Sequence, residues 1–525
     1  MTAAASSVRA SAASHRELLR LAAIDVGTNS IHMIVAQIDA DGAVTTLWRM
    51  KEPVGLGRLS FPNKTLTAAA MEPAAAALSR FQHAAVQRGA EKIIAVATSA
   101  IREAANGGDL IERFRRDAKT TVRVISARDE ARLIYLAVRH AYPLRQIPAL
   151  IIDVGGGSVE FVVGDGKKAS MLESRKLGAA RMTSRFVNSD PISKEDLQKL
   201  RKHYDAELSP LYKQIEPLRP SFAIGTSGTL ENIAAMAAEF SPNGIQTPAV
   251  IERRAFDKLL HTLIKSDSKQ RGRMKGLDEQ RRDQIVAGAV LVGRLFENLK
   301  LKKITICHAA LREGLILDYL SKHIPDLQIR RDVPDPRRRA VLDLARRCDW
   351  HQNHSEHVTM LCLKLFDELK TLHGLGTLER EVIEFGSLLH DIGWHISGKG
   401  HHRHSMYLIE HGDLSPFTRE EVAIMSNIAR YHRKDPPTKE HEQYAALPLR
   451  SRRVVDVGSA LLRLADGLDR THASVVQNLK CKIGEKKVQV VIDTRADAQL
   501  EMWGAKRKSD YFGSVFGKKL EIAIK

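Results

Sequence analysis

One short motif occurs twice in this chain, and the repeat limits the possible folds more than any other feature. Residues 24–30 read IDVGTNS and residues 152–158 read IDVGGGS, each between two strand-like apolar runs. A dinucleotide-binding fingerprint would continue from its glycines into a helix. The alternation after each turn predicts a second strand instead. Two such strand–turn–strand units, far apart in the chain, predict a duplicated α/β domain with one phosphate loop in each half.

The rest of the pattern predicts the other elements of this α/β part. Strand-like runs alternate with amphipathic helical stretches, as in domains with mixed sheets. The expected strands are 21–27, 31–38, 92–98, 121–126, 149–155, 159–164, 221–227 and 302–308, and the clearest helices are 71–89, 129–141 and 283–299.

The character of the sequence changes twice after this part. The charged and proline-bearing stretch at 330–339 indicates a linker, and nearly everything from there to about residue 478 is helical. Strand-like alternation returns in KVQVVID, QLEMW and KLEIAI. We therefore expect a disordered extension at 1–20, in preference to a transit peptide, then subdomains at 21–145 and 146–325. A helical domain at 326–478 and a small β-rich piece at 479–525 would follow.

The two hairpins carry groups that suit a phosphate and a metal ion. Glycines at a strand tip let backbone N–H groups converge on an anion, and Thr28, Asn29, Ser30 and Ser158 add polar side chains. Asp153 and Glu160 lie on the two arms of the second hairpin, so both can face one ion. Mg²⁺ usually takes one or two carboxylates together with phosphate oxygens and waters. The hairpins therefore predict a Mg²⁺-assisted phosphate site.

Seven motifs, in a fixed order along the chain, resemble those of a known protein family. They are DVGTNS (25–30), ATSAIREAAN (97–106), ISARDEARLIY (125–135), DVGGGSVEF (153–161), GTSGT (225–229), RMKGLDEQRRDQIVAG (273–288) and ALREGLI (310–316). In these stretches the chain resembles the exopolyphosphatase/guanosine pentaphosphate phosphatase family. The resemblance implies the duplicated, ribonuclease H-like fold of actin, sugar kinases and the large heat-shock chaperones.

The resemblance also implies a role for each matching residue. Glu130 aligns with the general base, which would deprotonate a water that attacks the terminal phosphorus. Asp129 is its neighbour and rival, but adjacent helical side chains point about 100° apart, so one of the two should face the cleft. Asp153 and Glu160 align with Mg²⁺ ligands. The phosphate-binding positions are Gly27, Thr28, Asn29, Ser30, Arg102, Gly155, Gly156, Gly157 and Ser158.

The helical region contains a second group of potential metal ligands. His354 is followed by His390 and Asp391 in SLLHDIGWH and by Asp466 in LLRLADGLDR. This order resembles the HD phosphohydrolase superfamily, and it implies an all-α HD domain with a second divalent metal. His357 is a rival for the first ligand, and further histidines stand at 401, 402, 404 and 432. The alternative is a scaffold that grips substrate without a metal.

Charge and composition limit the partners. Lys and Arg number 81 against 62 Asp and Glu, a formal charge of +19, which attracts polyanions. Basic residues are not interleaved with aromatic ones, so we expect no specific nucleic acid, and we find no apolar run that could span a membrane. Four cysteines without CxxC spacing suit a reducing cytoplasm. We expect a homodimer, and a cationic path for a long substrate along 271–282 and 330–339.

These features predict an exopolyphosphatase that releases the terminal phosphate of inorganic polyphosphate. The closest alternative is a 5′-phosphohydrolase of guanosine pentaphosphate, because both substrates present a terminal anhydride phosphate to the same loops. A kinase of the actin fold, with GTSGT as an adenosine loop, ranks below them. So does a non-catalytic sensor of the guanosine alarmone, because Glu130 and the HD ligands are all present.

Overall fold

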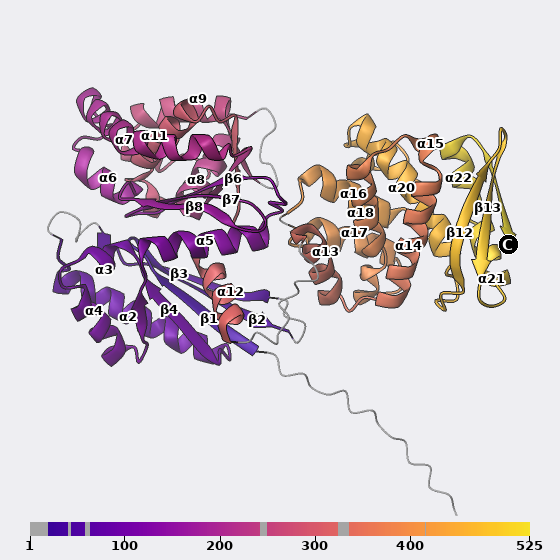
Figure 1. The fold of residues 1–525 in the computed structure, drawn as a ribbon, viewed down its shortest axis with the longest axis horizontal. Helices are drawn as coiled ribbons and strands as arrows, with labels where there is room; N and C mark the ends of the chain where they lie inside the picture. Colours follow the sequence, from indigo (N-terminus) through magenta and orange to yellow (C-terminus); the bar gives the residue numbers. More distant parts are fainter. Residues whose placement is uncertain (1–18, 40–43, 58–63, 242–248, 324–334, 415) are drawn as a thin grey trace, which may run out of the picture. The chain divides into compact units, whose positions relative to one another are not determined.

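The computed structural model describes residues 19–39, 44–57, 64–241, 249–323, 335–414 and 416–525 (Figure 1). These residues form two compact units, the first up to residue 323 and the second from residue 335 onward. The expected extension at 1–20 lies outside the described residues except for Leu19 and Arg20, which begin the first strand. The expected boundary at 325/326 also lies outside them. Among the described residues, no helix combines the length and apolar character needed to cross a membrane.

Two mixed sheets form the first unit, and their strand orders show the duplication. One sheet has the order β3-β2-β1-β4-β5, and the other has β8-β7-β6-β9-β11 followed by β10. In each, the first hairpin is antiparallel and the next two strands run parallel to its first arm. The first sheet consists of β1 (Leu19–Val26), β2 (Ser30–Ile38), β3 (Val44–Pro53), β4 (Lys92–Ala97) and β5 (Val122–Val124). The second consists of β6 (Ala149–Val154), β7 (Val159–Gly164), β8 (Ala169–Arg175), β9 (Phe222–Thr226), β10 (Val250–Glu252) and β11 (Lys303–Ile306).

Helices cover the outer faces of both sheets and also fill the layer between them (Figure 1). The first sheet is covered by α2 (Ala68–Gln87), α3 (Ser99–Glu103) and α4 (Gly107–Asp117). The second is covered by α6 (Ala179–Phe186), α7 (Lys194–Ile215), α8 (Ser227–Ala238), α9 (Arg253–Lys265) and α11 (Ile285–Asn298). Short pieces lie at η1 (Glu216–Leu218), α10 (Ser268–Arg271) and η2 (Glu279–Arg281).

The two inner helices are exchanged between the halves. Helix α5 (Ala127–Ala141) follows a strand of the first sheet but packs against β7 and β8 of the second. Helix α12 (Leu311–His323) follows the second sheet and packs against β1 and β2 of the first. The start of α5 therefore lies where the two halves meet. This arrangement is the duplicated α/β domain that the repeat predicted, with the actin-like architecture that the family resemblance implied.

Three strands of the first unit were not predicted. They are β3, β8 and β10, which lie at the outer positions of the two sheets. The side chains of β3 and β8 are at most partly buried, and β3 carries the charged run RMKE, so these two sequences lack the apolar stretch expected of a central strand. Strand β10 has only three residues, of which Ile251 is buried, and is too short to show an alternation.

The second unit is a bundle of helices that shares one apolar core with a three-stranded sheet. Its longer helices are α13 (Pro336–Arg347), α14 (Gln352–Glu368), α16 (Thr377–Leu388), α17 (His401–His411), α18 (Arg419–Arg430) and α20 (Leu449–Gly467). Short turns lie at α15 (Lys370–His373), η3 (Ile392–His395) and α19 (Glu442–Ala445). The sheet has the order β12-β13-β14, formed by β12 (Val476–Ile483), β13 (Lys487–Thr494) and β14 (Lys519–Ile524).

Two local predictions for this unit were wrong. Residues 335–339 belong to the start of α13 rather than to a linker, because Asp335 accepts a hydrogen bond from the Arg337 amide and Pro336 occupies the first helical position. The run QLEMW belongs to α21 (Gln499–Lys506), which is followed by α22 (Ser509–Phe516), and not to a strand. Alternation over five residues is too short to separate a strand from a helix.

Candidate functional site

Both repeated hairpins close with the same hydrogen bond. The Gly27 amide donates to the Ser30 carbonyl at 3.1 Å, and the Gly155 amide donates to the Ser158 carbonyl at 3.1 Å. The two turns approach each other closely, since a Cβ added to Gly156 would lie 2.5 Å from Asn29 Nδ2. Residues 27–30 and 155–158 all line one pocket of the first unit. The repeat therefore brings both predicted phosphate loops together.

Strand alternation directs the acidic side chains of the hairpins into this pocket. The odd residues Leu21 and Ala23 of β1 pack in the layer between the sheets, so Asp25 faces the same layer at the end of the strand. Ala149 and Ile151 direct Asp153 in the same way, and Asp153 pairs across the hairpin with Glu160. All three carboxylates line the pocket, and Glu160 Oε1 accepts a hydrogen bond from Ser174 Oγ at 2.8 Å.

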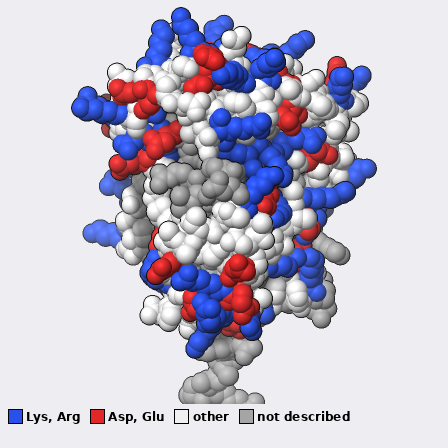
Figure 2. Space-filling view, turned by 90° about the vertical axis from the view of Figure 1, so that its left-hand side faces the viewer, with Lys and Arg blue, Asp and Glu red and all other residues white. Residues whose placement is uncertain are grey.

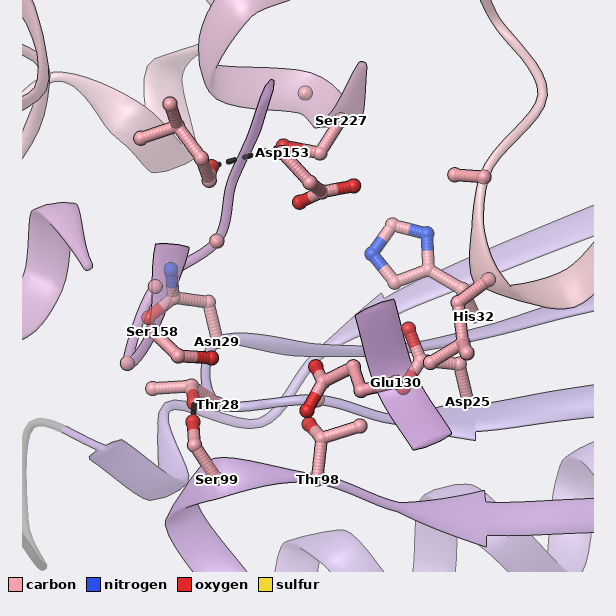
Figure 3. Close-up of a pocket in the computed structure, with 18 of the residues that line it drawn as sticks. Asp25, Thr28, Asn29, His32, Thr98, Ser99, Glu130, Asp153, Ser158 and Ser227 are labelled. Atoms are coloured by element: carbon pink, nitrogen blue, oxygen red, sulfur yellow. Dashed lines mark hydrogen bonds between the residues drawn. The ribbon is translucent and has the colours of Figure 1, made fainter. Parts of the chain in front are cut away.

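The fourth carboxylate comes from the start of α5. Ser126 caps this helix by accepting a hydrogen bond from the Asp129 amide at 3.0 Å. Glu130, in the first turn, is 7% exposed and points into the pocket, where Figure 3 shows it next to Asp25. Asp129 points away, and its carboxylate contacts Ser126 and Arg132. The structure thus places Glu130, and not its neighbour, among the lining residues.

These four carboxylates make the pocket strongly acidic. Burial and the nearby Glu130 raise the pKa of Asp25 and of Asp153 to about 7. Burial, Glu130 and Asp153 raise the pKa of Glu160 well above its usual value. Burial also raises the pKa of Glu130, against the opposing effect of Arg102. Asp25 Oδ1 is buried and has no hydrogen-bond partner among the described residues. Such a cluster is costly without a cation, so these donors fit a divalent metal ion.

Arg102 does not lie among the lining residues. Its Nη1 atom donates to Glu130 Oε2 at 2.8 Å and to the Ile125 carbonyl at 3.0 Å. Arg102 therefore contacts the Glu130 carboxylate without lining the pocket itself. The structure therefore joins this predicted phosphate ligand to the predicted base.

Three basic side chains of the pocket received no role in the reaction from the sequence, although one of them, Arg281, lies on the expected cationic path along 271–282. They are His32, Arg281 and Arg312. His32 stands opposite Asp25 on the first hairpin, at the position that Glu160 occupies in the second. Arg281 Nη1 donates to Thr229 Oγ1 at 3.0 Å, and Arg312 Nη1 lies 3.4 Å from His32 Nδ1. Arg281 and Arg312 stand within motifs that were used for the family resemblance, which is the signal that could have found them.

The helical unit brings its predicted ligands together as well. His354 Nε2 lies 3.6 Å from Asp466 Oδ1 and 3.9 Å from Asp391 Oδ2, and His390 Nε2 lies 3.7 Å from Asp391 Oδ2. The Nε2 atoms of both histidines are buried without a hydrogen-bond partner in the described structure. His357, the rival for the first position, instead contacts Asp469 and the Val476 carbonyl.

The expected cationic path is not supported at one arginine in each of its two stretches, Arg271 and Arg337. Arg271 is 4% exposed and its guanidinium is held by Asp190 and the Ser266 carbonyl. Arg337 is 9% exposed and is paired with Glu421 at 2.7 Å. Since carboxylates already neutralise these arginines, this part of the prediction was wrong.

Comparison with known proteins identifies the same family for both units. A model of the Ppx/GppA phosphatase family matches residues 34–323, and a model of Ppx/GppA phosphatase, domain III, matches residues 337–502. A guanosine-5′-triphosphate,3′-diphosphate pyrophosphatase of Vibrio vulnificus is 28% identical over 500 residues, which cover 93% of this chain and 96% of that protein.

Shorter relatives match the first unit. Exopolyphosphatase 1 of Mycobacterium tuberculosis is 30% identical over 301 residues, which are 57% of this chain and 88% of that protein. The crystal structure of an exopolyphosphatase from Cytophaga hutchinsonii is 30% identical with a TM-score of 0.54, and it covers 57% of this chain and 98% of its own.

Proposed function

Because the chain belongs to the Ppx/GppA phosphatase family, we propose that it hydrolyses the terminal phosphoanhydride bond of inorganic polyphosphate with the help of Mg²⁺. The observation that carries this proposal is the pocket in which two matched phosphate-type loops meet four carboxylates, three of which belong to buried residues. The relatives named exopolyphosphatase align with the first unit, which contains this pocket.

Each group of the pocket has a part in the proposed reaction. Backbone amides of residues 27–30 and 155–158 would hold the terminal phosphates. Asp153 and Glu160 would hold Mg²⁺, which neutralises the charge that spreads over the equatorial oxygens of the transferred phosphoryl group. The Arg281 guanidinium, which lines the same pocket, adds a second positive charge.

Glu130 would act as the general base. Its carboxylate takes a proton from a water, the water oxygen bonds to the terminal phosphorus, and the bond from that phosphorus to the bridging oxygen breaks. The products are orthophosphate and a chain shorter by one phosphate. The hydrogen bond from Arg102 fixes the orientation of the carboxylate, so we assign Arg102 a positioning role in addition to the phosphate-binding role implied by the family.

Guanosine pentaphosphate is the second candidate substrate. The Vibrio vulnificus relative, whose name specifies guanosine-5′-triphosphate,3′-diphosphate, aligns with nearly the whole chain and so with both units. The basic charge suits both polyanions, and the face drawn in Figure 2 carries many Lys and Arg side chains with acidic ones among them. We also propose that the chain is cytoplasmic, which accords with four free cysteines. We propose in addition that it forms a homodimer.

Phosphate release measured side by side tests this proposal. The wild-type chain is given long polyphosphate or guanosine pentaphosphate, each with Mg²⁺ and with a chelator. We expect Mg²⁺-dependent release from polyphosphate, with the higher kcat/KM of the two. Exclusive release from the nucleotide would transfer the assignment to the second candidate, and release from neither would refute both.

For the helical unit we propose the HD phosphohydrolase fold, with His354, His390, Asp391 and Asp466 as ligands of a divalent metal ion. The convergence of their donor atoms, with two Nε2 atoms buried and unpaired, supports this proposal. Polyphosphate hydrolysis should not depend on that metal.

A further inference from the structure

The short helix α3 contacts the first phosphate loop at one end and the proposed base at the other. Ser99 begins the helix, and its Oγ lies 3.0 Å from Thr28 Oγ1 in the first loop, as Figure 3 shows. Arg102, in the last turn, donates to Glu130 Oε2 at 2.8 Å. The helix ends at the next residue, Glu103, to which the proposed reaction gives no role.

Glu103 reaches into the other half of the first unit. Its Oε1 accepts a hydrogen bond from Arg181 Nη2 at 2.7 Å, and its Oε2 lies 2.8 Å from Lys176 Nζ. Arg181 belongs to α6 and Lys176 follows β8, so both cations belong to the half that contains the second phosphate loop. The Arg181 side chain is 16% exposed, whereas that of Lys176 is 71% exposed. The contact with Arg181 is therefore the better protected of the two.

The same arginine also holds the second phosphate loop. Its Nε donates to the Gly157 carbonyl at 2.7 Å. The backbone amides of Ala179, Arg181 and Gly178 donate to the carbonyls of Gly155, Gly156 and Gly157 at 3.0, 3.0 and 3.3 Å. In a trans peptide the carbonyl and the following amide point in opposite directions, so the amides of residues 156–158 point away from α6. These amides belong to the group that would hold the terminal phosphates.

A guanidinium suits this double contact because its N–H groups form a rigid fork. Nη2 of Arg181 binds Glu103 while Nε binds the second loop, so the two contacts move together. We infer that Glu103 is a positioning residue for the hydrolysis: through Arg181 it fixes the second phosphate loop relative to the helix turn that holds the base. The inference rests on the proposed function, since it presumes that Glu130 is the base.

The rival interpretation is an ion pair that only joins the two halves. Burial raises the pKa of Glu130, and the nearby charge of Glu103 adds to the rise, so this charge acts close to the site. A negative charge there repels a polyanion, and a partly exposed ion pair contributes little to stability. If the pair had no further role, removal of Glu103 would leave kcat unchanged or lower KM. A positioning role predicts a loss of kcat instead, because a base that is misplaced by a fraction of its bond to water works poorly.

Steady-state release of orthophosphate from long polyphosphate tests the inference on the whole chain. We expect Glu103→Ala to lower kcat about tenfold and to leave KM within about threefold of the wild type, since both loops keep their own contacts. Glu103→Gln keeps an oxygen that can accept from Arg181, so it should retain more of kcat than Glu103→Ala. Lys176→Ala is the matched control. It removes the exposed partner of the same carboxylate and should keep kcat within about twofold.

A double-mutant cycle in kcat tests the path through Arg181. Arg181→Ala removes both the link to Glu103 and the hydrogen bond to the loop, so it should lower kcat and also raise KM. If the two residues act as one link, the variant with Glu103→Ala and Arg181→Ala should lose no more kcat than Arg181→Ala alone. Losses that multiply would show separate actions and would overturn the inference.

The remaining outcomes separate this inference from the proposed function. Wild-type kcat in both Glu103 variants, or a loss that only follows the unfolded fraction in thermal unfolding, overturns the inference and leaves the proposed function standing. A loss of kcat in Lys176→Ala equal to that in Glu103→Ala would also overturn it, because the exposed ion pair would then suffice. A wild-type chain that releases no phosphate refutes the proposed function and the inference with it.

Discussion

Replacement of Glu130 by glutamine changes one proton-accepting group and little else. Glu130 is 7% exposed, and its Oε2 accepts a hydrogen bond from Arg102 at 2.8 Å. Glutamine has the same shape and keeps a carbonyl oxygen for Arg102, but it cannot take a proton from water. Burial raises the pKa of Glu130, so the neutral amide should not lower the free energy of unfolding.

The expected loss follows from this geometry. A missing general base costs about 10²–10⁴-fold in turnover, which corresponds to about 3–5 kcal/mol in the barrier. Since the loops and the metal ligands stay intact, kcat for polyphosphate should fall by that factor and KM should stay within about threefold. The assay is steady-state release of orthophosphate, with thermal unfolding measured on the same preparations.

Asp129→Asn is the matched control. Asp129 is the adjacent acid of the same helix turn, and its carboxylate contacts Ser126 and Arg132 outside the pocket. We expect its turnover to stay near that of the wild type. If Asp129→Asn abolishes hydrolysis and Glu130→Gln does not, the placement of the base is wrong by one residue.

Three further predictions concern the metal site, its pH dependence and a partly buried ion pair. Asp153→Asn and Glu160→Gln should each raise the Mg²⁺ concentration for half-maximal activity, and an unchanged Mg²⁺ titration in both variants would remove them from the metal site. Because the pKa of Asp153 is raised to about 7, protons compete with Mg²⁺ below that value, so the Mg²⁺ requirement of the wild type should rise between pH 8 and pH 6; a flat requirement would contradict this. Arg337→Ala breaks a partly buried pair with Glu421 and should lower the free energy of unfolding by about 1–3 kcal/mol in urea titrations, with KM for long polyphosphate unchanged; a raised KM without loss of stability would restore the cationic path.

The hairpins could be predicted from the sequence because neighbouring residues determine their structure. The repeated motif specifies a strand, a tight turn and a second strand, and alternation directs Asp25, Asp153 and Glu160 to one face. The capped start of α5 likewise separates Glu130 from Asp129. The edge strands β3 and β8 were missed because partly exposed strands carry no apolar run.

Contacts between distant segments could not be predicted in this way. The pairing of Arg102 with Glu130 depends on how α3 and α5 pack, and the burial of Arg337 depends on Glu421 from α18. His401 and His432 were visible as histidines, but their approach to Asp391 depends on three separate segments of the helical unit. The sequence shows which residue types are present and how they are spaced. Contacts between distant segments can be identified only once the tertiary fold is known.

Hydrolysis of polyphosphate in water enriched in oxygen-18 would show most directly where the water attacks. If Glu130 activates a water toward the terminal phosphorus, the released orthophosphate should contain one solvent oxygen per cleavage and the shortened chain should contain none. The Glu130→Gln protein should lose this incorporation together with turnover. Label in the new chain end would mean attack on the next phosphorus, and release without label in orthophosphate would contradict terminal hydrolysis by water.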